Sequence, residues 1–470
     1  MTVENIDVSA TLEKLKKQLQ EEKNLSPTFR ATVELLMLVV TLLVNRLGRN
    51  SKNSSLPPSQ DPHRKKISKK AKGKPGGQKG HKGRTLQKID NPQVIQEIEI
   101  DRRTIPPGNY TKAGYESRQV FDVTIDLCVT EYRAEVLQDA LGRRYVAPFP
   151  YGITKAAQYG NEVKAQSVYL SQFQLIPLAR VEDYFNDQVG LPISQGTIAN
   201  FNQEAYDLLE PFEAWARDKL LKSPLIHADE TSINRNGDTI WLHNLSNEKV
   251  TFYHADEKRG KEGMDRMGVL PKYRGQVVHD HLKSYYRYEE CDHNLCNSHH
   301  LRELERAWEE DRQQWARSLK RLLIKMNEAM VKAGGVLSEA EEIKYRKRYR
   351  KILKKGAEEC PKPIPKEPGK RGRQKKARCL NLLERLRDFE DDVLRFMSVK
   401  EVPFTNNQAE RDLRMTKVQQ KISGCFRSME GAKIFCRVRG FLSTCRKNKV
   451  STTDALKDLF QGKLPVFMSG

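Results

Sequence analysis

The chain has 470 residues, a formal net charge of +22 and a hydrophobic content of 38%. This length predicts several domains, and the composition suffices for a folded core while leaving room for solvated segments. The longest apolar run, residues 35–44, is about half the length that crosses a bilayer. The eight cysteines include no Cys-x-x-Cys pair, and the N-terminus lacks the basic region of a signal peptide. We therefore expect a soluble protein of the reducing cytosol, not a membrane or disulfide-stabilised secreted protein.

The positive charge is concentrated in two segments. Residues 51–90 hold 12 Lys and Arg against two Asp, and residues 344–378 hold 16 Lys and Arg against three Glu. The rest of the chain is close to neutral. A near-neutral body with two basic segments is typical of proteins that bind polyanions, such as nucleic acids.

Residues 1–50 are predicted to be helical. Leucines recur at helical spacing in two groups: Leu12, Leu15 and Leu19, then Leu35, Leu38 and Leu42. The pattern leaves two interpretations open. The helices could form a short leucine-zipper-like coiled coil that dimerises the protein, or they could simply pack into a core.

Residues 51–90 are predicted to form a disordered basic arm, because Ser, Pro, Lys and Gly dominate and nothing there can bury apolar surface. A plain solvated linker is the alternative, but the density of charge favours contact with phosphates. The cations expected to bind DNA in this arm are Lys65, Lys66, Lys69, Lys70, Lys72, Lys74, Lys79, Lys82 and Arg84.

Two smaller units are predicted next. Residues 91–150 alternate apolar and polar side chains at 94–100 and 117–127, which indicates a small β-rich module. Residues 151–220 are helical, and within them residues 179–202 have the proportions of a helix-turn-helix (HTH) in which Ser194 caps the second helix. A helical hairpin without a DNA role fits about as well, because the second helix begins without Lys or Arg.

An α/β segment follows. Strands are expected at 225–233, 239–245, 250–254 and 276–280, with an Asn-Gly turn in the first hairpin and a helix before the last strand. This order is that of a ribonuclease-H-like core. We assign the core to residues 221–300 plus 398–450, a basic helical insertion to 301–397 and a tail to 451–470. The fold class is thus multidomain α+β: an N-terminal helix and arm, the β-rich module, the HTH-like domain, and an α/β core that the insertion interrupts.

Three acids, Asp229, Asp280 and Glu410, are the candidate catalytic residues. The first two end β-type runs and the third begins a basic helix, so that together they could hold two divalent ions at a phosphodiester. Glu410 could instead complete a capping box with Asn407, and an Asp at a strand end is often a turn residue. Asp229 and its neighbour Glu230 point to opposite sides of their strand, and the pattern does not choose between them.

The expected ion is Mg²⁺, or Mn²⁺, because carboxylate oxygens are hard ligands. Further cations on the helix of Glu410 are expected to hold phosphates: Arg411, Arg414, Lys417 and Lys421. Eight of the ten histidines lie between residues 227 and 300. Cys296 and His299 have the spacing of metal ligands, but no second Cys pair accompanies them. A structural role for this pair is at least as good an interpretation, and zinc is not expected.

Several phrases of the chain resemble the insertion-sequence-66 family of transposases over nearly the whole length. They are Arg49-Asn-Ser-Lys-Asn-Ser-Ser-Leu-Pro-Pro-Ser-Gln-Asp-Pro, Gly76-Gly-Gln-Lys-Gly-His-Lys-Gly, Tyr169-Leu-Ser, Gly190-Leu-Pro-Ile-Ser-Gln-Gly-Thr-Ile, Asp229-Glu-Thr, Cys296-x-x-His299, Asn406-Asn-Gln-Ala-Glu-Arg-Asp-Leu-Arg, and Lys421-Ile-Ser-Gly with Arg427-Ser. The resemblance implies that Asp229, Asp280 and Glu410 are the metal ligands of a DDE-type transposase, and that Arg427 lies in the DNA-binding core.

The resemblance also implies a function. The protein would bind the double-stranded ends of an insertion sequence, cut them and join them to target DNA, as a homo-oligomer in the bacterial nucleoid, with accessory proteins and no membrane. Similar proteins carry a zinc module after the arm, whereas residues 101–148 contain only Cys128. A catalytically decayed end-binder or repressor is therefore the alternative function, and a metal-dependent nuclease without strand transfer is a third.

Overall fold

The computed structural model describes residues 2–3, 6–22, 25–47, 86–150, 152–363 and 376–469. The basic arm from Lys65 to Arg84 lies outside the described residues, as do residues 364–375 of the second basic segment. The described part is a mixed α+β protein, as expected. None of its helices is long and apolar enough to cross a membrane.

The N-terminal residues form a helical hairpin. Its elements are β1 (Thr2–Val3), β2 (Ile6–Asp7), α1 (Val8–Glu21) and α2 (Pro27–Leu47). The Arg30 guanidinium donates hydrogen bonds of 2.9 Å to the carbonyls of Leu19 and Glu22, which ties α2 to the end of α1. The prediction of helices is confirmed. Side chains such as Leu35 and Leu38 of α2 remain more than half exposed in the single chain.

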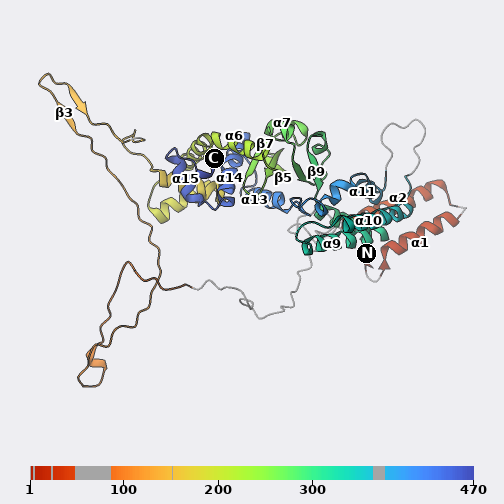
Figure 1. Ribbon diagram of the computed structural model, residues 1–470, viewed down its shortest axis with the longest axis horizontal. Helices are drawn as coiled ribbons and strands as arrows, with labels where there is room; N and C mark the ends of the chain where they lie inside the picture. Colours follow the sequence, from red (N-terminus) through yellow and green to blue (C-terminus); the bar gives the residue numbers. More distant parts are fainter. Residues whose placement is uncertain are drawn as a thin grey trace.

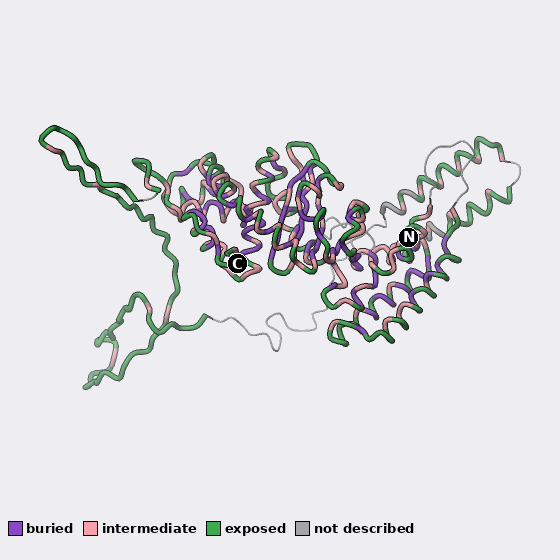
Figure 2. Tube along the Cα trace, turned by 45° about the horizontal axis from the view of Figure 1, so that its top comes forward, coloured by how far each residue is buried: buried purple, intermediate pink, exposed green. Residues whose placement is uncertain are grey.

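Residues 86–150 contain little regular structure. Their elements are η1 (Arg102–Thr104), β3 (Val136–Gln138) and β4 (Arg144–Val146). The strands expected at 94–100 and 117–127 are absent, so that prediction was wrong. Alternating side chains favour a strand only where one face can be buried. No residue of this segment is buried, and Figure 2 shows it extending away from the body.

A five-stranded sheet lies at the centre of the body (Figure 1). Its order is β7-β6-β5-β8-β9, with β5 antiparallel to β6, β6 antiparallel to β7, and β5, β8 and β9 parallel. The strands are β5 (Leu225–Arg235), β6 (Asp238–Ser246), β7 (Thr251–Asp256), β8 (Gln276–His279) and β9 (Asp292–Leu295). Asn236 and Gly237 both have positive φ in the first hairpin, which is why this turn needs Asn-Gly. The expected strands and turn are confirmed.

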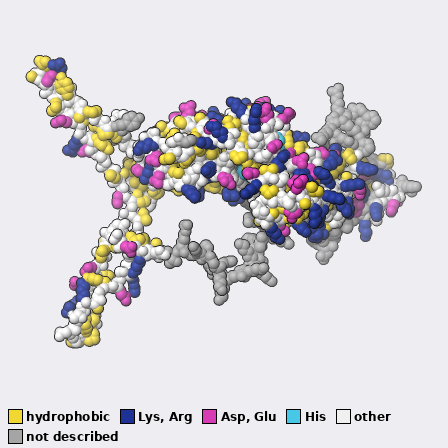
Figure 3. All heavy atoms as spheres, in the orientation of Figure 1, with side chains coloured by type: hydrophobic (Ala, Val, Ile, Leu, Met, Phe, Trp, Pro, Cys, Tyr) yellow, Lys and Arg dark blue, Asp and Glu magenta, His cyan; other side chains and the backbone are white. Residues whose placement is uncertain are grey.

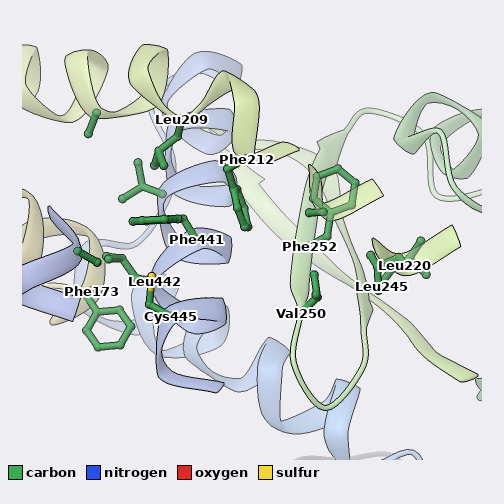
Figure 4. Close-up of a cluster of buried hydrophobic side chains, with 14 of the residues drawn as sticks. Phe173, Leu209, Phe212, Leu220, Leu245, Val250, Phe252, Phe441, Leu442 and Cys445 are labelled. Carbon is green, nitrogen blue, oxygen red and sulfur yellow. The ribbon is translucent and has the colours of Figure 1, made fainter. Parts of the chain in front are cut away.

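Helices that precede the sheet in the chain and helices near its C-terminus share a core with one face of the sheet. They are α3 (Asn161–Val168), η2 (Tyr169–Phe173), α4 (Leu178–Tyr184), η3 (Phe185–Val189), α5 (Gln195–Leu208), α6 (Glu210–Leu221), α14 (Met429–Lys447) and α15 (Thr452–Phe460). Phe212 and Phe441 meet edge-to-face with ring centroids 5.5 Å apart, close to Phe252 of β7 (Figure 4). The helical region and the last segment of the chain therefore share one core with the sheet.

The helix-turn-helix proportions are present in α4 and α5. Ser194 accepts a hydrogen bond of 3.2 Å from the Thr197 amide, so the predicted cap is confirmed. Gly190 has φ of 69° in the turn before it. Ile198 and Ala205 of α5 are buried in the common core, which occupies one side of this helix. A DNA-reading role for α5 stays a prediction.

A helical insertion with its own core lies between β9 and residue 407 in the chain. Its elements are α8 (Asn297–Glu309), α9 (Gln314–Lys332), α10 (Glu339–Glu359), α11 (Arg378–Asp388), α12 (Glu390–Leu394) and η6 (Arg395–Met397). Trp315, Leu319, Leu383 and Met397 form the centre of its core. Shorter elements near the sheet are α7 (Lys261–Met267), η4 (Leu270–Lys272), η5 (Tyr285–Arg287) and η7 (Val466–Met468).

After the insertion, α13 (Asn407–Ser423) runs along the second face of the sheet. Leu413 of α13 shares a buried cluster with Ile233 of β5. The loop after the helix is bonded to the end of β5: the Phe426 amide donates to the Asn234 carbonyl at 2.8 Å, and the Asn236 amide donates to the Phe426 carbonyl at 2.9 Å. The position of α13 on β5 is therefore fixed at its C-terminal end.

Gly356 in α10 gives a test of packing in the insertion. A Cβ atom there would lie 2.4 Å from Leu383 Cδ1 and 2.8 Å from the Trp315 ring. Overpacking of this kind costs about 1–3 kcal/mol, which exceeds the roughly 0.5–1 kcal/mol that Ala gains over Gly in a helix. Gly356→Ala should therefore lower the urea midpoint of unfolding.

Gly431→Ala in α14 is the matched control. The nearest atom to its new Cβ would be Ser428 Oγ at 3.5 Å, an ordinary contact. This variant should keep or slightly raise the midpoint. A Gly356→Ala protein as stable as the control would contradict the packing described for α9, α10 and α11.

Candidate active site

Asp229 lies within β5, not at its end as expected, because the strand continues to Arg235, whereas Asp280 directly follows the neighbouring parallel strand β8. His227 of β5 is paired with Val278 of β8, so continuing this register by two residues sets Asp229 beside Asp280. Asp280 directly follows the last residue of β8, and its Oδ1 accepts a hydrogen bond of 3.0 Å from the Leu282 amide. Parallel strands thus bring together two acids that are 51 positions apart.

The adjacent acid Glu230 points to the opposite face of β5 and is fully bonded. The Arg259 guanidinium donates to Glu230 Oε1 at 2.9 and 3.1 Å, and the Tyr285 hydroxyl donates to Oε2 at 2.8 Å. Its side chain is 1% exposed. Both oxygens of this carboxylate therefore accept hydrogen bonds from side chains of the fold.

Asp229 lies on the face of β5 that α13 covers, two strand repeats from Ile233. The structure gives its carboxylate one hydrogen bond within the described residues, from the Glu230 amide to Oδ1 at 2.9 Å. Burial raises the pKa of Asp229 well above its usual value, and the negative charges of Glu230, Asp280 and Glu410 raise it further. Asp229 is thus an acid whose oxygens remain available and whose neighbours favour a bound cation.

Glu410 lies in the first turn of α13, where its side chain is 32% exposed. Its Oε1 lies 3.8 Å from His299 Nδ1 and 4.0 Å from Arg302 Nη2, beyond hydrogen-bonding distance. Both Glu410 Oε1 and His299 Nδ1 are buried atoms without a hydrogen-bond partner among the described residues. A buried carboxylate oxygen without a donor is unfavourable, and a cation would satisfy it.

The capping alternative for Glu410 is not realised. The helix starts at Asn407, so the residue at the cap position is Asn406, and the Asn406 side chain makes no capping bond. The Glu410 amide instead donates to the Asn406 carbonyl at 3.2 Å, in the ordinary helical pattern. The Glu410 carboxylate therefore does not cap the N-terminus of the helix.

Asn406 connects the parts of the site. Its amide nitrogen donates to the Ala228 carbonyl at 2.8 Å, and its Oδ1 lies 2.7 Å from His227 Nδ1. The His227 Nδ1 must then carry the proton that it donates, and burial lowers the pKa of this imidazole, which keeps it neutral. The backbone amide of Asn406 donates to Cys296 Sγ at 3.1 Å. One buried residue therefore links β5, the start of α8 and the start of α13.

Cys296, His299 and Glu410 form a compact group. Their ligand atoms all lie within 4.8 Å of one another. Burial raises the pKa of the Cys296 thiol to about 11, so the thiol is neutral without a metal. A structural zinc site usually has four ligands, and the described residues supply three here. The sequence predicted the Cys-His pair but gave no sign that Glu410, more than 100 positions away, joins it.

The three predicted acids are arranged more loosely. Within the described part of the chain, no group of three potential ligands that includes Asp229 or Asp280 is as compact as the Cys296 group. A pair of ions about 3.5–4 Å apart does not need all carboxylates to converge on one point. The donor set and the unsatisfied Glu410 oxygen are compatible with such a pair.

The cations of α13 divide into two kinds. Arg414, Lys417 and Lys421 follow Glu410 by four, seven and eleven positions and share its helix face, whereas Arg411 lies about 100° away. The exposed side chains include Arg411, Arg414 and Lys417 of this helix, and Arg427 of the loop after it. Lys417 Nζ donates to the Ser232 carbonyl of β5, and burial lowers the pKa of Lys417. Lys417 therefore anchors the helix, which the sequence did not predict.

Two histidines support the turn that holds Asp280. The His281 amide donates to His279 Nδ1 at 3.1 Å, so His279 Nε2 carries the proton and donates to His293 Nδ1 at 3.1 Å. His293 Nε2 then donates to the Tyr288 carbonyl at 3.2 Å. Burial lowers the pKa of both imidazoles, which keeps them neutral. Their role here is to hold the backbone.

Asn406→Ala should destabilise the protein strongly. The substitution removes the two side-chain bonds and leaves His227 Nδ1–H and the Ala228 carbonyl buried without partners, at a cost of about 2–4 kcal/mol. Asn407→Ala, at the exposed neighbouring position, should change the free energy of unfolding by less than about 0.5 kcal/mol. Chemical denaturation of both variants measures this, and equal effects would refute the linking role of Asn406.

Two parts of the chain match known protein families. Residues 2–87 match a family of unknown function (DUF6444). No curated protein matches the chain. Residues 156–434, which contain the sheet, the insertion and α13, match the model described as Transposase IS66 family. This match covers more than half of the chain, so the chain belongs to the IS66 family of transposases.

Proposed function

We propose that the protein is a DNA transposase in which Asp229, Asp280 and Glu410 hold two Mg²⁺ ions at the DNA strand to be cut. Membership of the family supports a transposase, with DNA as the partner and a divalent metal as cofactor. The observation that carries the assignment of residues is the register of β5 and β8, which sets Asp229 beside Asp280; the buried Glu410 Oε1, without a partner among the described residues, adds the third acid. Three acids close enough to repel one another suit a site that is completed by cations.

The sheet order supports the same proposal. Three antiparallel strands followed by two parallel ones, with one acid within β5 and another directly after β8, is the arrangement expected of a ribonuclease-H-like core. Glu410 on α13 completes this set from the helix that covers the same face. The insertion between Asp280 and Glu410 leaves this arrangement intact.

The chemistry proposed is two in-line displacements. Water attacks the phosphorus at an element end, the bond from phosphorus to the 3′-oxygen breaks, and the 3′-oxygen leaves as a hydroxyl. That 3′-hydroxyl then attacks a phosphorus of the target and displaces the target's 3′-oxygen. Asp229, Asp280 and Glu410 would hold the Mg²⁺ ions, which when bound would lower the pKa of the attacking oxygen and stabilise the leaving one.

The remaining residues position the substrate. Arg411 and Arg414 lie exposed within one turn of Glu410, where they can hold phosphate oxygens. Glu230, through Arg259 and Tyr285, holds the strand on which Asp229 lies.

Two element ends must be joined, so we propose a homo-oligomer assisted by accessory proteins in the bacterial nucleoid.

A decayed DNA-binding protein is the second candidate function. Cys128 is exposed within the weakly structured residues 86–150, where similar proteins carry a zinc module. Such a protein would bind DNA and produce neither nicks nor joined strands. A nuclease would produce nicks without joined strands.

Glu410→Gln tests the catalytic assignment. With labelled element-end DNA, Mg²⁺ or Mn²⁺ and the accessory proteins, the wild type should yield nicked and joined products. The variant should lose at least about 100-fold in rate, which corresponds to about 2.7 kcal/mol of barrier. Glu430→Gln, at an exposed position in the first turn of α14, should retain activity. Undiminished cleavage by Glu410→Gln would disprove the assignment.

Asp229→Asn tests the site without an activity assay. A raised pKa means that the fold opposes the ionised form, so at pH 7.5 the carboxylate of Asp229 destabilises the metal-free protein. Removing it should raise the thermal midpoint, by about 2–4 °C for each kcal/mol gained. Mg²⁺ should stabilise the wild type, more strongly as pH rises because protons then compete less, and should leave the variant unchanged.

Asp187→Asn, at an exposed position in η3, is the control and should respond to Mg²⁺ as the wild type does. A metal-free Asp229→Asn protein that is less stable than the wild type, or that Mg²⁺ stabilises equally, would count against a metal site at Asp229.

A further inference from the structure

Helix α10 carries a row of positive side chains on the side that faces away from the insertion core. Residues 343–357 contain eight Lys or Arg and no Asp or Glu. The buried side of the helix is formed by Tyr349, Leu353 and Gly356. At about 100° per residue, six of the eight cations point to the opposite side. These six, all exposed, are Lys344, Lys347, Arg348, Lys351, Lys354 and Lys355, and we call them the α10 stripe.

The other two cations of this segment are used within the fold. Arg346 is paired with Glu342 and Asp391 at 2.8 Å and with Glu390 at 3.1 Å. Arg350 is paired with Glu390 at 2.9 Å. Within the described residues, by contrast, no member of the α10 stripe forms an ion pair. The helix thus directs two arginines to acids of the insertion, while the six cations of the stripe have no ion pair with any acid among the described residues.

A solvated helix face is the simplest alternative, but such a face usually alternates positive and negative side chains. Here like charges follow one another at three and four positions, which destabilises a helix. The helix is held despite this repulsion: Ser338 and Glu341 form a capping box at its start, and the Glu359 carboxylate accepts a hydrogen bond of 3.0 Å from the Trp315 amide. A rigid, self-repelling row of cations indicates a polyanionic partner.

We propose that the α10 stripe binds the phosphate backbone of duplex DNA beside the strand that is cut, and that it does so without reading sequence. The proposal rests on the proposed function. Five of the six side chains are Lys, whose compact charge on a flexible stem suits phosphates, whereas bidentate reading of bases favours Arg, Asn and Gln. From Lys344 to Lys355 the stripe is about 16 Å long, the length of about five base pairs.

The position of α10 agrees with this partner. Helix α9 packs between α8 and α10, and α8 carries His299, which lies beside Glu410. Packed helix axes are about 8–10 Å apart, which puts α10 about 20 Å from α8. One turn of duplex DNA is about 34 Å long, so one duplex can reach both places. Figure 3 shows Lys and Arg gathered over this end of the molecule.

The test compares two variants with the same change in charge. The stripe variant carries Lys344→Gln, Lys347→Gln, Lys351→Gln and Lys354→Gln. Lys and Gln have similar helix propensities, and circular dichroism should show unchanged helix content. The control variant carries the same substitution at four exposed positions outside the insertion: Lys249, Lys272, Lys433 and Lys449.

Binding of the full chain to a fluorescent 30-base-pair duplex of arbitrary sequence is followed by anisotropy between 50 and 300 mM NaCl. Losing four phosphate contacts should make the negative slope of log K against log salt concentration shallower by about 3–4. It should also weaken binding at least tenfold at about 100 mM salt. The control should lose less than about threefold. The stripe variant should lose the same affinity for a second duplex of unrelated sequence.

The outcomes separate the two proposals. If the stripe variant binds like the wild type while Glu410→Gln abolishes metal-dependent cleavage, the stripe does not bind DNA and the proposed function stands. If the stripe and control variants lost the same affinity for DNA, the effect would be due to net charge alone, and the proposal that the stripe binds DNA would be overturned. A wild type without affinity for the duplex would overturn both proposals.

Discussion

The buried hydrogen bonds of Asn406 are the interactions on which the candidate site depends. They join residues 178 positions apart between α13 and β5, and 110 positions apart between α13 and the start of α8. Each bond lies inside the protein, where an unpaired donor or acceptor is costly. The first turn of α13 can therefore hardly move relative to β5, and Glu410 is held close to Asp229 although the chain between them includes a whole helical insertion.

Electrostatics assigns different roles to two neighbouring acids. Burial and the charge of Asp280 raise the pKa of Glu230, but the bonds from Arg259 and Tyr285 and the charge of Arg259 oppose this rise. Asp229 forms no ion pair with the described residues, and burial together with the surrounding acids raises its pKa well above the usual value. Negative charge is therefore concentrated around Asp229. Clustered carboxylates of this kind destabilise the fold in the absence of a cation and favour the binding of one.

The sequence predicted the local features and the proximity of Asp229 and Asp280, but it missed other contacts between distant residues. The strands around Asp229 and Asp280, the Asn-Gly turn and the Ser194 cap follow from short patterns of residues, and all are present. The strands expected at 94–100 and 117–127 failed because alternation reports a strand only when a partner buries one face. The contacts of Asn406 and Lys417 reach β5 from 178 and 185 positions away, and no local pattern carries that information.

The surface charge of the helical insertion can change independently of the candidate site. The chain leaves the sheet at Asn297 and returns at Phe404, and the Asn297 amide donates to the Phe404 carbonyl at 3.1 Å, so entry and exit are fastened to each other. Between these two points the helices bury their own core around Trp315 and Leu383. Because the two ends are fixed together, surface charge on α10 can vary without moving Glu410. Positioning of the acids and attraction of a polyanion are therefore separate physical properties of one continuous chain.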